Sequence, residues 1–173
     1  SRDTILAAYR AMTALAATRI DRVIAGYQPE SVVVIPYPEF QERAGLPPSY
    51  QRAPDDRSRP AWFLINLGRP ERMAVGNAAA HEAYPGHHLQ RIAASQATSV
   101  HPVMRTLSVS AFSEGWGIYS EDLGAEMGLY TTELDSIGHL VHILDVAVAY
   151  YLDAGTHVRG WTRAMLVDSM YAI

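Results

Sequence analysis

The sequence predicts a mainly α-helical fold with a small β element, and three observations support this fold class. Residues 3–26 carry apolar side chains at three- and four-residue spacing and end at Gly26, which is typical of an amphipathic helix. The same helical spacing prevails from Arg69 to the end of the chain. Two short runs, SVVVIP at 31–36 and AWFLIN at 61–66, are bounded by turn residues and predict strands.

Between these runs, residues 44–60 hold several prolines and charges and predict an exposed loop. After the second strand the pattern predicts four helices, at about 70–95, 103–127, 131–153 and from Thr162 to the end. No internal repeat, low-complexity tract or linker interrupts the chain, so we expect residues 1–173 to form one domain. The chain starts directly in a helical pattern and ends without a stop signal, so we also expect this domain to be the core of a longer protein.

Composition excludes several classes of function. The net charge of −4 and the pI of about 5.9 give no electrostatic footprint for nucleic acid. Without cysteine there is no disulfide and no thiolate ligand, so a metal site must use His, Asp or Glu. No unbroken apolar run approaches the roughly 18 residues of a membrane span, so we expect none. All fourteen basic residues are arginine, a pattern typical of high-GC bacteria; compartment and oligomeric state stay open.

The stretch HEAYPGHH, residues 81–88, resembles the zinc-protease signature H-E-x-x-H with two extra residues. In a regular helix, His81 and His87 are separated by about 120° and about 9 Å, too far to share an ion. Pro85 removes the bond to the His81 carbonyl, and Gly86 is free in its dihedral angles. This pair permits a break that brings His87 back towards His81. His88, seven residues on, returns to the same face but lies about two turns away.

Glu114, on the predicted helix 103–127, is the candidate third ligand. Two imidazoles and a carboxylate would leave the fourth position of a zinc ion for water. Glu82, beside the first ligand, would then take the proton of that water and pass it to the leaving amine. The alternative is that His81 and His87 merely line a surface or a helix end.

Other polar and aromatic residues leave two readings open. Glu121 either orients a ligand histidine or is an exposed helix charge. His139 and His142, three apart on a predicted helix, are expected as partly buried polar residues. Trp116 and Tyr119 are expected in core packing rather than in substrate contacts.

Three ordered motifs, HEAYPGHHLQ, SEGWGIYSEDLG and YLDAGTHVRGWTR, resemble the bacterial domain of unknown function 885 family, or DUF885, over roughly residues 55–171. That family is grouped with the zinc peptidases of the H-E-x-x-H type. The resemblance implies a metallopeptidase-like helical fold with zinc at His81, His87 and Glu114 and with Glu82 as base. It also favours His87 over His88 as the second ligand.

One departure from the family pattern concerns the third motif. Members usually carry an arginine four residues before its aspartate, Asp153, where this chain has Ala149. The candidates for polarising a substrate carbonyl are therefore His157 and Tyr150 or Tyr151. The alternative is that Asp153 and His157 only cap and brace a helix end.

These patterns lead to the hypothesis of a zinc-dependent hydrolase whose substrate is a peptide or a small amide. Two alternatives stay open: a non-catalytic zinc-binding scaffold domain, and a metal-dependent hydrolase of a non-peptide substrate. Cleavage within a chain and cleavage at its ends are equally compatible with the sequence.

Overall fold

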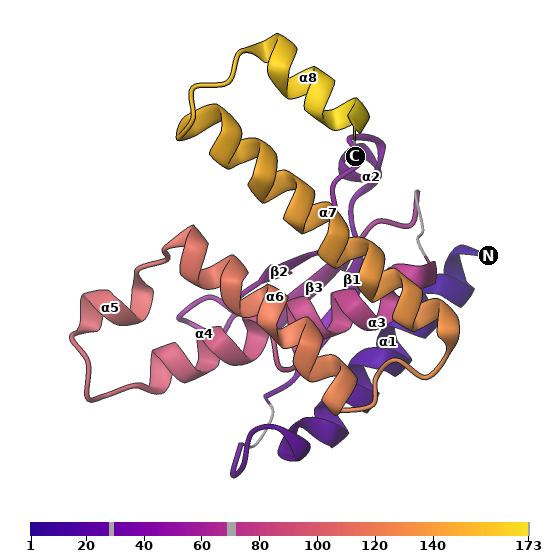
Figure 1. The fold of residues 1–173 in the computed structure, drawn as a ribbon. Helices are drawn as coiled ribbons and strands as arrows, with labels where there is room; N and C mark the ends of the chain where they lie inside the picture. The colour runs from indigo at the N-terminus through magenta and orange to yellow at the C-terminus, as the bar shows by residue number, and fades with distance from the viewer. Residues whose placement is uncertain (28–29, 69–71, 173) are drawn as a thin grey trace.

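The computed structural model describes residues 1–27, 30–68 and 72–172, and it is mainly helical with one small sheet (Figure 1). The strands are β1 (Val32–Pro36), β2 (Ser49–Gln51) and β3 (Ala61–Ile65). The helices are α1 (Arg2–Arg19), α2 (Glu39–Arg43), α3 (Val75–Ala78), α4 (His87–Gln96), α5 (Pro102–Thr106), α6 (Ser110–Glu126), α7 (Glu133–His157) and α8 (Arg163–Ala172). The predicted fold class is confirmed.

Individual elements differ from the prediction in their ends and breaks. The first helix ends at Arg19 and continues as a short 3-10 turn, Ile20–Arg22. The predicted loop 44–60 contains β2, and the predicted helix 103–127 is two helices, α5 and α6, at an angle. The start predicted for the helix at 70–95 lies outside the described residues, and from Arg72 onward this segment is divided into short helical turns and is broken at 84–86.

The sheet has the strand order β1-β3-β2, with β1 parallel and β2 antiparallel to the central β3. β3 is apolar along its length and is buried, as expected for a strand with neighbours on both edges. Helix α1 covers the sheet with a face that includes Ile5, Tyr9 and Ala16, and the Tyr9 ring meets Phe63 of β3 edge-on at 5.8 Å. The main hydrophobic core lies between this helix and the sheet.

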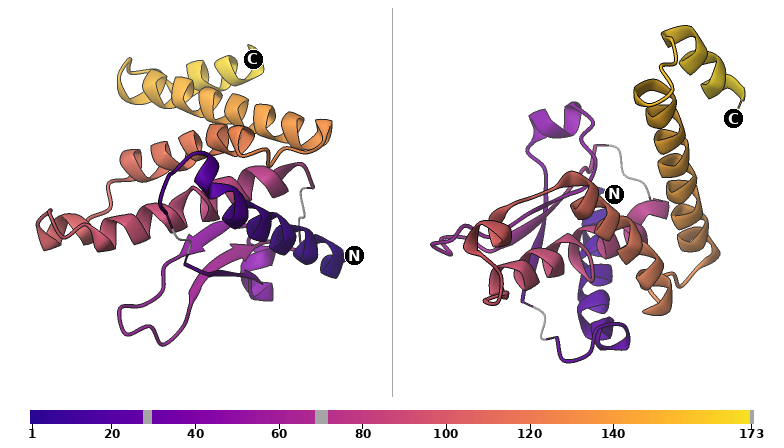
Figure 2. Two further views of the ribbon diagram at one scale, coloured as in Figure 1. Left: turned by 90° about the horizontal axis from the view of Figure 1, so that it is seen from below. Right: turned by 60° about the vertical axis from the view of Figure 1, so that its left-hand side comes forward.

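The helices from α3 to α8 are stacked on the same side of the sheet (Figure 2). α3 and the following turn Ala79–Ala83 lie next to α1, α4 extends from that turn, α6 crosses above them, and α7 with α8 forms the outermost layer. The N-terminal half of α7 packs closely on the 3-10 turn Arg72–Ala74, where a Cβ on Gly138 would lie 2.0 Å from the Met73 carbonyl oxygen. The segments that carry the predicted ligands, which are the residues after α3 and helix α6, therefore lie between α1 and α7.

Helix α7 is the one described helix that has the length and apolar composition of a membrane-spanning segment. Its outer face exposes Leu140 and Leu144, whereas His139 and His142 on the other face contact α6. No membrane span was expected from the sequence, because only unbroken apolar runs were considered. Polar residues interrupt such a run in α7. The expected absence of a span stays a prediction.

Candidate metal centre

The helix that carries His81 is opened by the Tyr84-Pro85-Gly86 segment. Residues Ala79–Ala83 form a π-helical turn, in which the Tyr84 N–H bonds to the Ala79 carbonyl oxygen at 3.1 Å. Tyr84 is then extended, with φ −125° and ψ 121°, and α4 begins at His87. A Cβ on Gly86 would lie 1.7 Å from the His81 carbonyl oxygen, so only glycine fits there.

The break has a partner on α6. The indole Nε1 of Trp116 donates a hydrogen bond of 2.9 Å to the Pro85 carbonyl oxygen, which the interrupted helix leaves without an intrahelical partner. Trp116 packs against the core as expected, and this hydrogen bond also stabilises the interruption of the helix at residues 84–86. Tyr119, expected in the core, is instead 53% exposed and meets the Trp116 ring at its edge.

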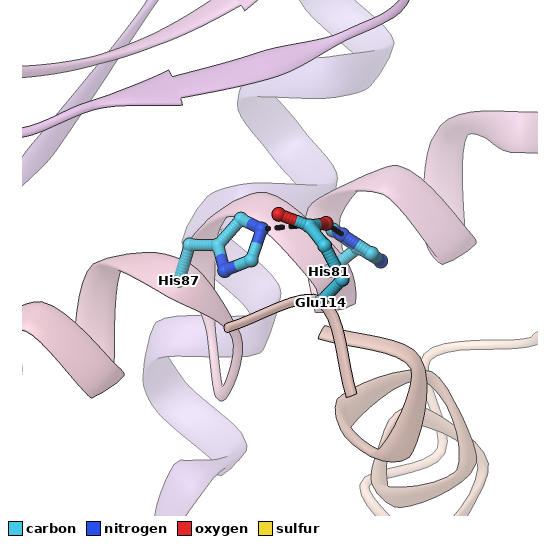
Figure 3. A group of neighbouring side chains, drawn as sticks. All are labelled: His81, His87 and Glu114. Carbon is cyan, nitrogen blue, oxygen red and sulfur yellow. Dashed lines mark ion pairs between the residues drawn. The ribbon is translucent and has the colours of Figure 1, made fainter. Parts of the chain in front are cut away.

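As a result, three side chains from three elements converge (Figure 3). His81 comes from the π-helical turn, His87 from the first residue of α4, and Glu114 from α6. Glu114 Oε2 lies 3.4 Å from His81 Nε2 and 3.5 Å from His87 Nε2, and the three ligand atoms lie within 4.8 Å of one another.

These distances fit a tetrahedral metal. Two atoms that each lie about 2.0–2.1 Å from a zinc ion, at the tetrahedral angle, are about 3.3–3.4 Å apart. Two imidazole nitrogens and a carboxylate are also a donor set that zinc accepts, with one position left open. The two distances from Glu114 match this separation, and the three side chains together could hold a metal ion.

Glycine on α6 makes room for the first ligand. A Cβ on Gly117 would lie 2.5 Å from both Nε2 and Cε1 of His81, so the imidazole lies directly against the backbone of α6. Gly117 follows Glu114 by three residues and therefore faces the same side of the helix. The E-G-W-G sequence thus supplies a ligand and, one turn later, the space for another ligand.

Glu121 orients His81 from the far side of the ring. This carboxylate is fully buried; its Oε1 accepts from His81 Nδ1 at 2.7 Å, and its Oε2 accepts from His142 Nδ1 at 2.9 Å. Because a carboxylate only accepts, the His81 proton sits on Nδ1 and Nε2 is free for a metal. Of the two readings of Glu121, the structure supports the orienting one.

The electrostatics of the pair agree with this arrangement. Burial opposes the charged form of His81, but the hydrogen bond to Glu121 and the nearby carboxylates outweigh it, so the pKa of His81 is raised. Burial likewise opposes the Glu121 charge, yet the bonds from His142 and His81 leave the pKa of Glu121 lowered. Burial and the charge of His81 both lower the pKa of His87.

Glu82 lies beside the convergent group and lines both cavities that adjoin it. The side chain is 8% exposed, and burial raises the pKa of Glu82 to about 7, against an opposing effect of His81. A bound cation lowers such a pKa. The carboxyl group is thus a proton acceptor placed at the edge of the cluster.

His88 takes no part in the cluster. The residue is 2% exposed. Its Nε2 donates to the Glu30 carbonyl oxygen at 2.8 Å, and its Nδ1 accepts from the Tyr50 hydroxyl at 3.2 Å, so neither nitrogen is free for a metal. The rings of Tyr50 and Tyr84 pack against it. His88 therefore anchors α4 to the core, while its neighbour His87 faces the opposite way.

The structure does not bring His157 to the cluster. His157 and Asp153 are both exposed and pair with each other at 3.6 Å near the end of α7. His157 follows His142 by fifteen residues, which is about 22 Å along a helix. Gly155 packs so closely on Trp161 that a Cβ would lie 2.2 Å from the indole ring. Within the third motif, the close packing at the corner between α7 and α8 is made by Gly155 and Trp161.

Of the two tyrosines predicted as polarising groups, Tyr150 lines the cavity next to His81, together with Ala149. Tyr151 instead packs on Trp161 at 5.2 Å. The position at which family members usually carry arginine therefore lies on the wall of this cavity, and here that wall is apolar.

The sequence favoured a partly buried polar role for His142 over contact with the site. His142 lines the same cavity and shares Glu121 with His81, whereas His139 stacks on Tyr130 and bonds to Asn77 and Asp122. The spacing of three residues between His139 and His142 places both on one face of α7, where they meet the adjacent acids Glu121 and Asp122 of α6. This spacing was the sequence feature that could have indicated the contact.

Comparisons with known proteins are consistent with these motifs. The family model described as "Bacterial protein of unknown function (DUF885)" matches residues 1–172. No curated protein matches the chain significantly.

Among solved structures, the chain is similar to the crystal structure described as "the putative lipoprotein from Colwellia psychrerythraea". The two share 26% sequence identity with a TM-score of 0.87, over 98% of this chain and 30% of that one. The chain therefore spans less than a third of the length of this relative.

Proposed function

Because the chain belongs to the bacterial family of unknown function DUF885, whose model covers residues 1–172, we propose that it contributes the zinc site of a hydrolase of peptide or related amide bonds. One observation carries the proposal: His81, His87 and Glu114 converge at zinc-ligand spacing, with the buried Glu82 at the edge of the group. The presence of an acceptor carboxyl beside an open metal position is what favours hydrolysis over a purely structural site.

Each residue has a defined task in this proposal. His81 and His87 bind through Nε2, and Glu114 binds through its carboxylate. Glu121 fixes the ring of His81 so that its Nε2 points to the shared position. Zinc, when bound, polarises the substrate carbonyl and lowers the pKa of water. Glu82 takes the proton of the attacking water and hands it to the leaving amine.

The test begins with metal content. Protein purified without chelators is expected to contain one zinc ion per chain, and a His81→Ala/Glu114→Ala double variant is expected to contain none. Elemental analysis by mass spectrometry measures both. A wild-type chain without zinc, with stability equal to that of the double variant, contradicts the proposal.

The second measurement is cleavage of a broad peptide library. Glu82→Gln keeps the three ligands, so it is expected to retain zinc and to lose about 10²–10⁴-fold in kcat/KM. Glu126→Gln changes an exposed glutamate at the end of α6 and is the matched control. Bound zinc without any cleavage that depends on Glu82 would identify a zinc-binding scaffold instead. Cleavage of esters or non-peptide amides alone would identify a different substrate.

A further inference from the structure

Two cavities adjoin the metal centre, and they share Pro48, Glu82 and Glu114 in their walls. One has a volume of about 590 Å³ and contains His81; we call it the His81 cavity. The other has a volume of about 650 Å³ and contains His87; we call it the His87 cavity. A substrate whose scissile bond lies at the shared wall would place its two sides in different cavities.

The His87 cavity is cationic. Its walls carry Arg52, Arg91 and Arg105, and its acidic residues are the shared Glu82 and Glu114 alone. Arg52 is exposed and pairs with Asp55 at 2.5 Å. Once Glu114 binds metal and Glu82 serves the attacking water, positive charge is in excess on this side.

Arg91 and Arg105 have no carboxylate partner in the part of the chain that the structure describes. The Arg91 guanidinium donates to the hydroxyl of Ser108 at 2.5 Å and lies 3.4 Å from that of Ser113. Arg105 donates to the Val100 carbonyl oxygen at 3.3 Å. Both side chains are partly buried, which reduces screening by salt. These bonds hold the guanidiniums in place and leave their charge uncompensated.

The His81 cavity differs in character. Its walls are mostly apolar, with Leu46, Ile118, Val146 and Ala149 among them, and its described lining contains no arginine. The two sides of the metal centre therefore select different chemistry: an apolar group next to His81, and an anionic group next to His87.

The position of Arg91 limits how far the anion lies from the scissile bond. Arg91 follows the ligand His87 by four residues on α4, so it lies about 6 Å further along the axis on the same face. An extended substrate advances at most about 3.3–3.6 Å per residue. The anionic group therefore lies one or two residues beyond the bond that is cleaved.

We propose that the His87 cavity binds a substrate carboxylate through Arg91, supported by Arg105, and that the enzyme releases the last one or two residues of peptides with an apolar residue before the scissile bond. This inference rests on the proposed function for the cleavage step, but carboxylate binding can be measured without it. An α-carboxylate and an acidic side chain offer the same chemistry, and the substrates below separate them.

The experiment uses three peptides of one apolar sequence: a C-terminal free acid, the corresponding amide, and an amide with glutamate as the last residue. Binding to the zinc-loaded Glu82→Gln protein is measured by calorimetry, and kcat/KM is measured with the wild type. Arg91→Gln and Arg105→Gln are each added to both backgrounds. Arg43→Gln, on α2 and outside both cavities, is the control.

We expect the free acid to bind at least tenfold more tightly than the amide. This preference is expected to be lost in Arg91→Gln, to fall only in part in Arg105→Gln, and to persist in Arg43→Gln. Recovery of binding by the glutamate-containing amide identifies a side-chain carboxylate as the ligand, and lack of recovery identifies the C-terminus. Zinc content equal to wild type in each variant shows that the site is intact.

Equal binding of free acid and amide, or a preference that survives both arginine substitutions, overturns the inference while cleavage that depends on Glu82 still supports the proposed function. Conversely, binding that depends on Arg91 without cleavage of any peptide contradicts the proposed function and leaves the carboxylate site standing.

Discussion

Glu121 is a carboxylate without solvent contact, and burial of such a charge is costly unless it is paired and hydrogen-bonded. Here it accepts one hydrogen bond from His81 and one from His142, so each oxygen has a partner. The Tyr130 hydroxyl also bonds to the Glu121 backbone carbonyl at 2.7 Å. Glu121 therefore fixes the orientation of the His81 ring, although it does not belong to the three-residue group that could hold a metal ion.

Substitution of Glu121 by Gln is expected to weaken zinc affinity by about 10–100-fold, because the amide no longer fixes the proton on His81 Nδ1. Titration against a chromophoric chelator measures the change. The control is Glu126→Gln on the same helix, where affinity is expected to stay the same. Equal affinities in the two variants would show that Glu121 does not orient the ligand.

Zinc affinity is also expected to depend on pH, because a ligand histidine must be neutral and protons compete with the metal. The raised pKa of His81 means that it takes up a proton at a higher pH than an ordinary histidine, so affinity starts to fall above pH 6.5 as the pH is lowered. His87, whose pKa is lowered, competes only at lower pH. Each protonated ligand costs about tenfold in affinity per pH unit.

Chelator competition between pH 5 and 8 tests this dependence. In Glu121→Gln the main group that raises the pKa of His81 is gone, so the onset of the loss is expected to move to lower pH. An onset that stays in place, or that moves upwards, contradicts the assigned cause.

At the residue level, the sequence predicted the donor types of the ligands and left the orienting role of Glu121 as one of two alternatives. His81, His87 and Glu114 follow from donor type, and the reach of His87 follows from what proline and glycine do to a helix. The role of His142 depends on how α6 and α7 cross, which no local pattern specifies. His157 was predicted as a polarising group in place of the family arginine, but its position depends on how far α7 extends beyond His142, which the motif does not specify.

At the level of elements, α6 serves as the wall against which the His81 ring lies. Gly117→Ala would place a methyl group 2.5 Å from the imidazole, so the ring or the helix must shift. We expect zinc affinity to fall at least tenfold. Gly115→Ala, two residues earlier on the same helix, meets nothing within 4 Å and is the matched control.

The control variant is expected to keep its zinc and to gain up to about 1 kcal/mol in the free energy of unfolding, because alanine has the higher helix propensity. Chelator titration and chemical denaturation measure the two quantities. If both alanine variants bind zinc as the wild type does, the His81 imidazole does not depend on the space that Gly117 leaves.

The breaks between elements show why sequence periodicity gave only part of the secondary structure. The apolar spacing of residues 103–127 continues through LSVS, although the backbone is extended at Leu107 and Val109 and separates α5 from α6. β2 has three residues, too few to show alternation, and it exists because β3 offers it an edge. In both cases tertiary contacts overrode the local pattern.

On the scale of the whole molecule, the candidate metal centre draws its ligands from the π-helical turn, α4 and α6, which are also joined by hydrogen bonds such as that from Trp116 to Pro85. A ligand that binds only the folded state stabilises it, by about 4 kcal/mol at a thousandfold excess over Kd. For a chain of this size each kcal/mol corresponds to about 2–4 °C in Tm.

We therefore expect a strong chelator to lower the Tm of the zinc-loaded protein by about 10 °C. Calorimetry with and without the chelator measures this, and readdition of zinc is expected to restore the Tm. In Glu114→Gln the chelator is expected to have little effect. A Tm that does not respond to zinc or chelator in the wild type would show that the three elements do not depend on the metal.

The outer layer differs from the rest of the molecule because large apolar side chains of α7, such as Leu140 and Leu144, are exposed and α8 has no buried residue. An apolar face of this kind is unusual on a free surface. The inner face of the same helix is chemically distinct, since it carries His139 and His142 to α6.

The Glu121 carboxylate connects two layers of the molecule, because its oxygens bond to His81 and to His142. Since Glu121 bonds at once to His81 on the π-helical turn and to His142 on α7, zinc bound at the proposed site would be reciprocally coupled to the docking of α7. Any factor that holds α7 against α6 strengthens metal binding by a certain ratio, and zinc strengthens that docking by the same ratio. A partner that binds α7 would therefore change the zinc affinity of the proposed site without contacting the ligands.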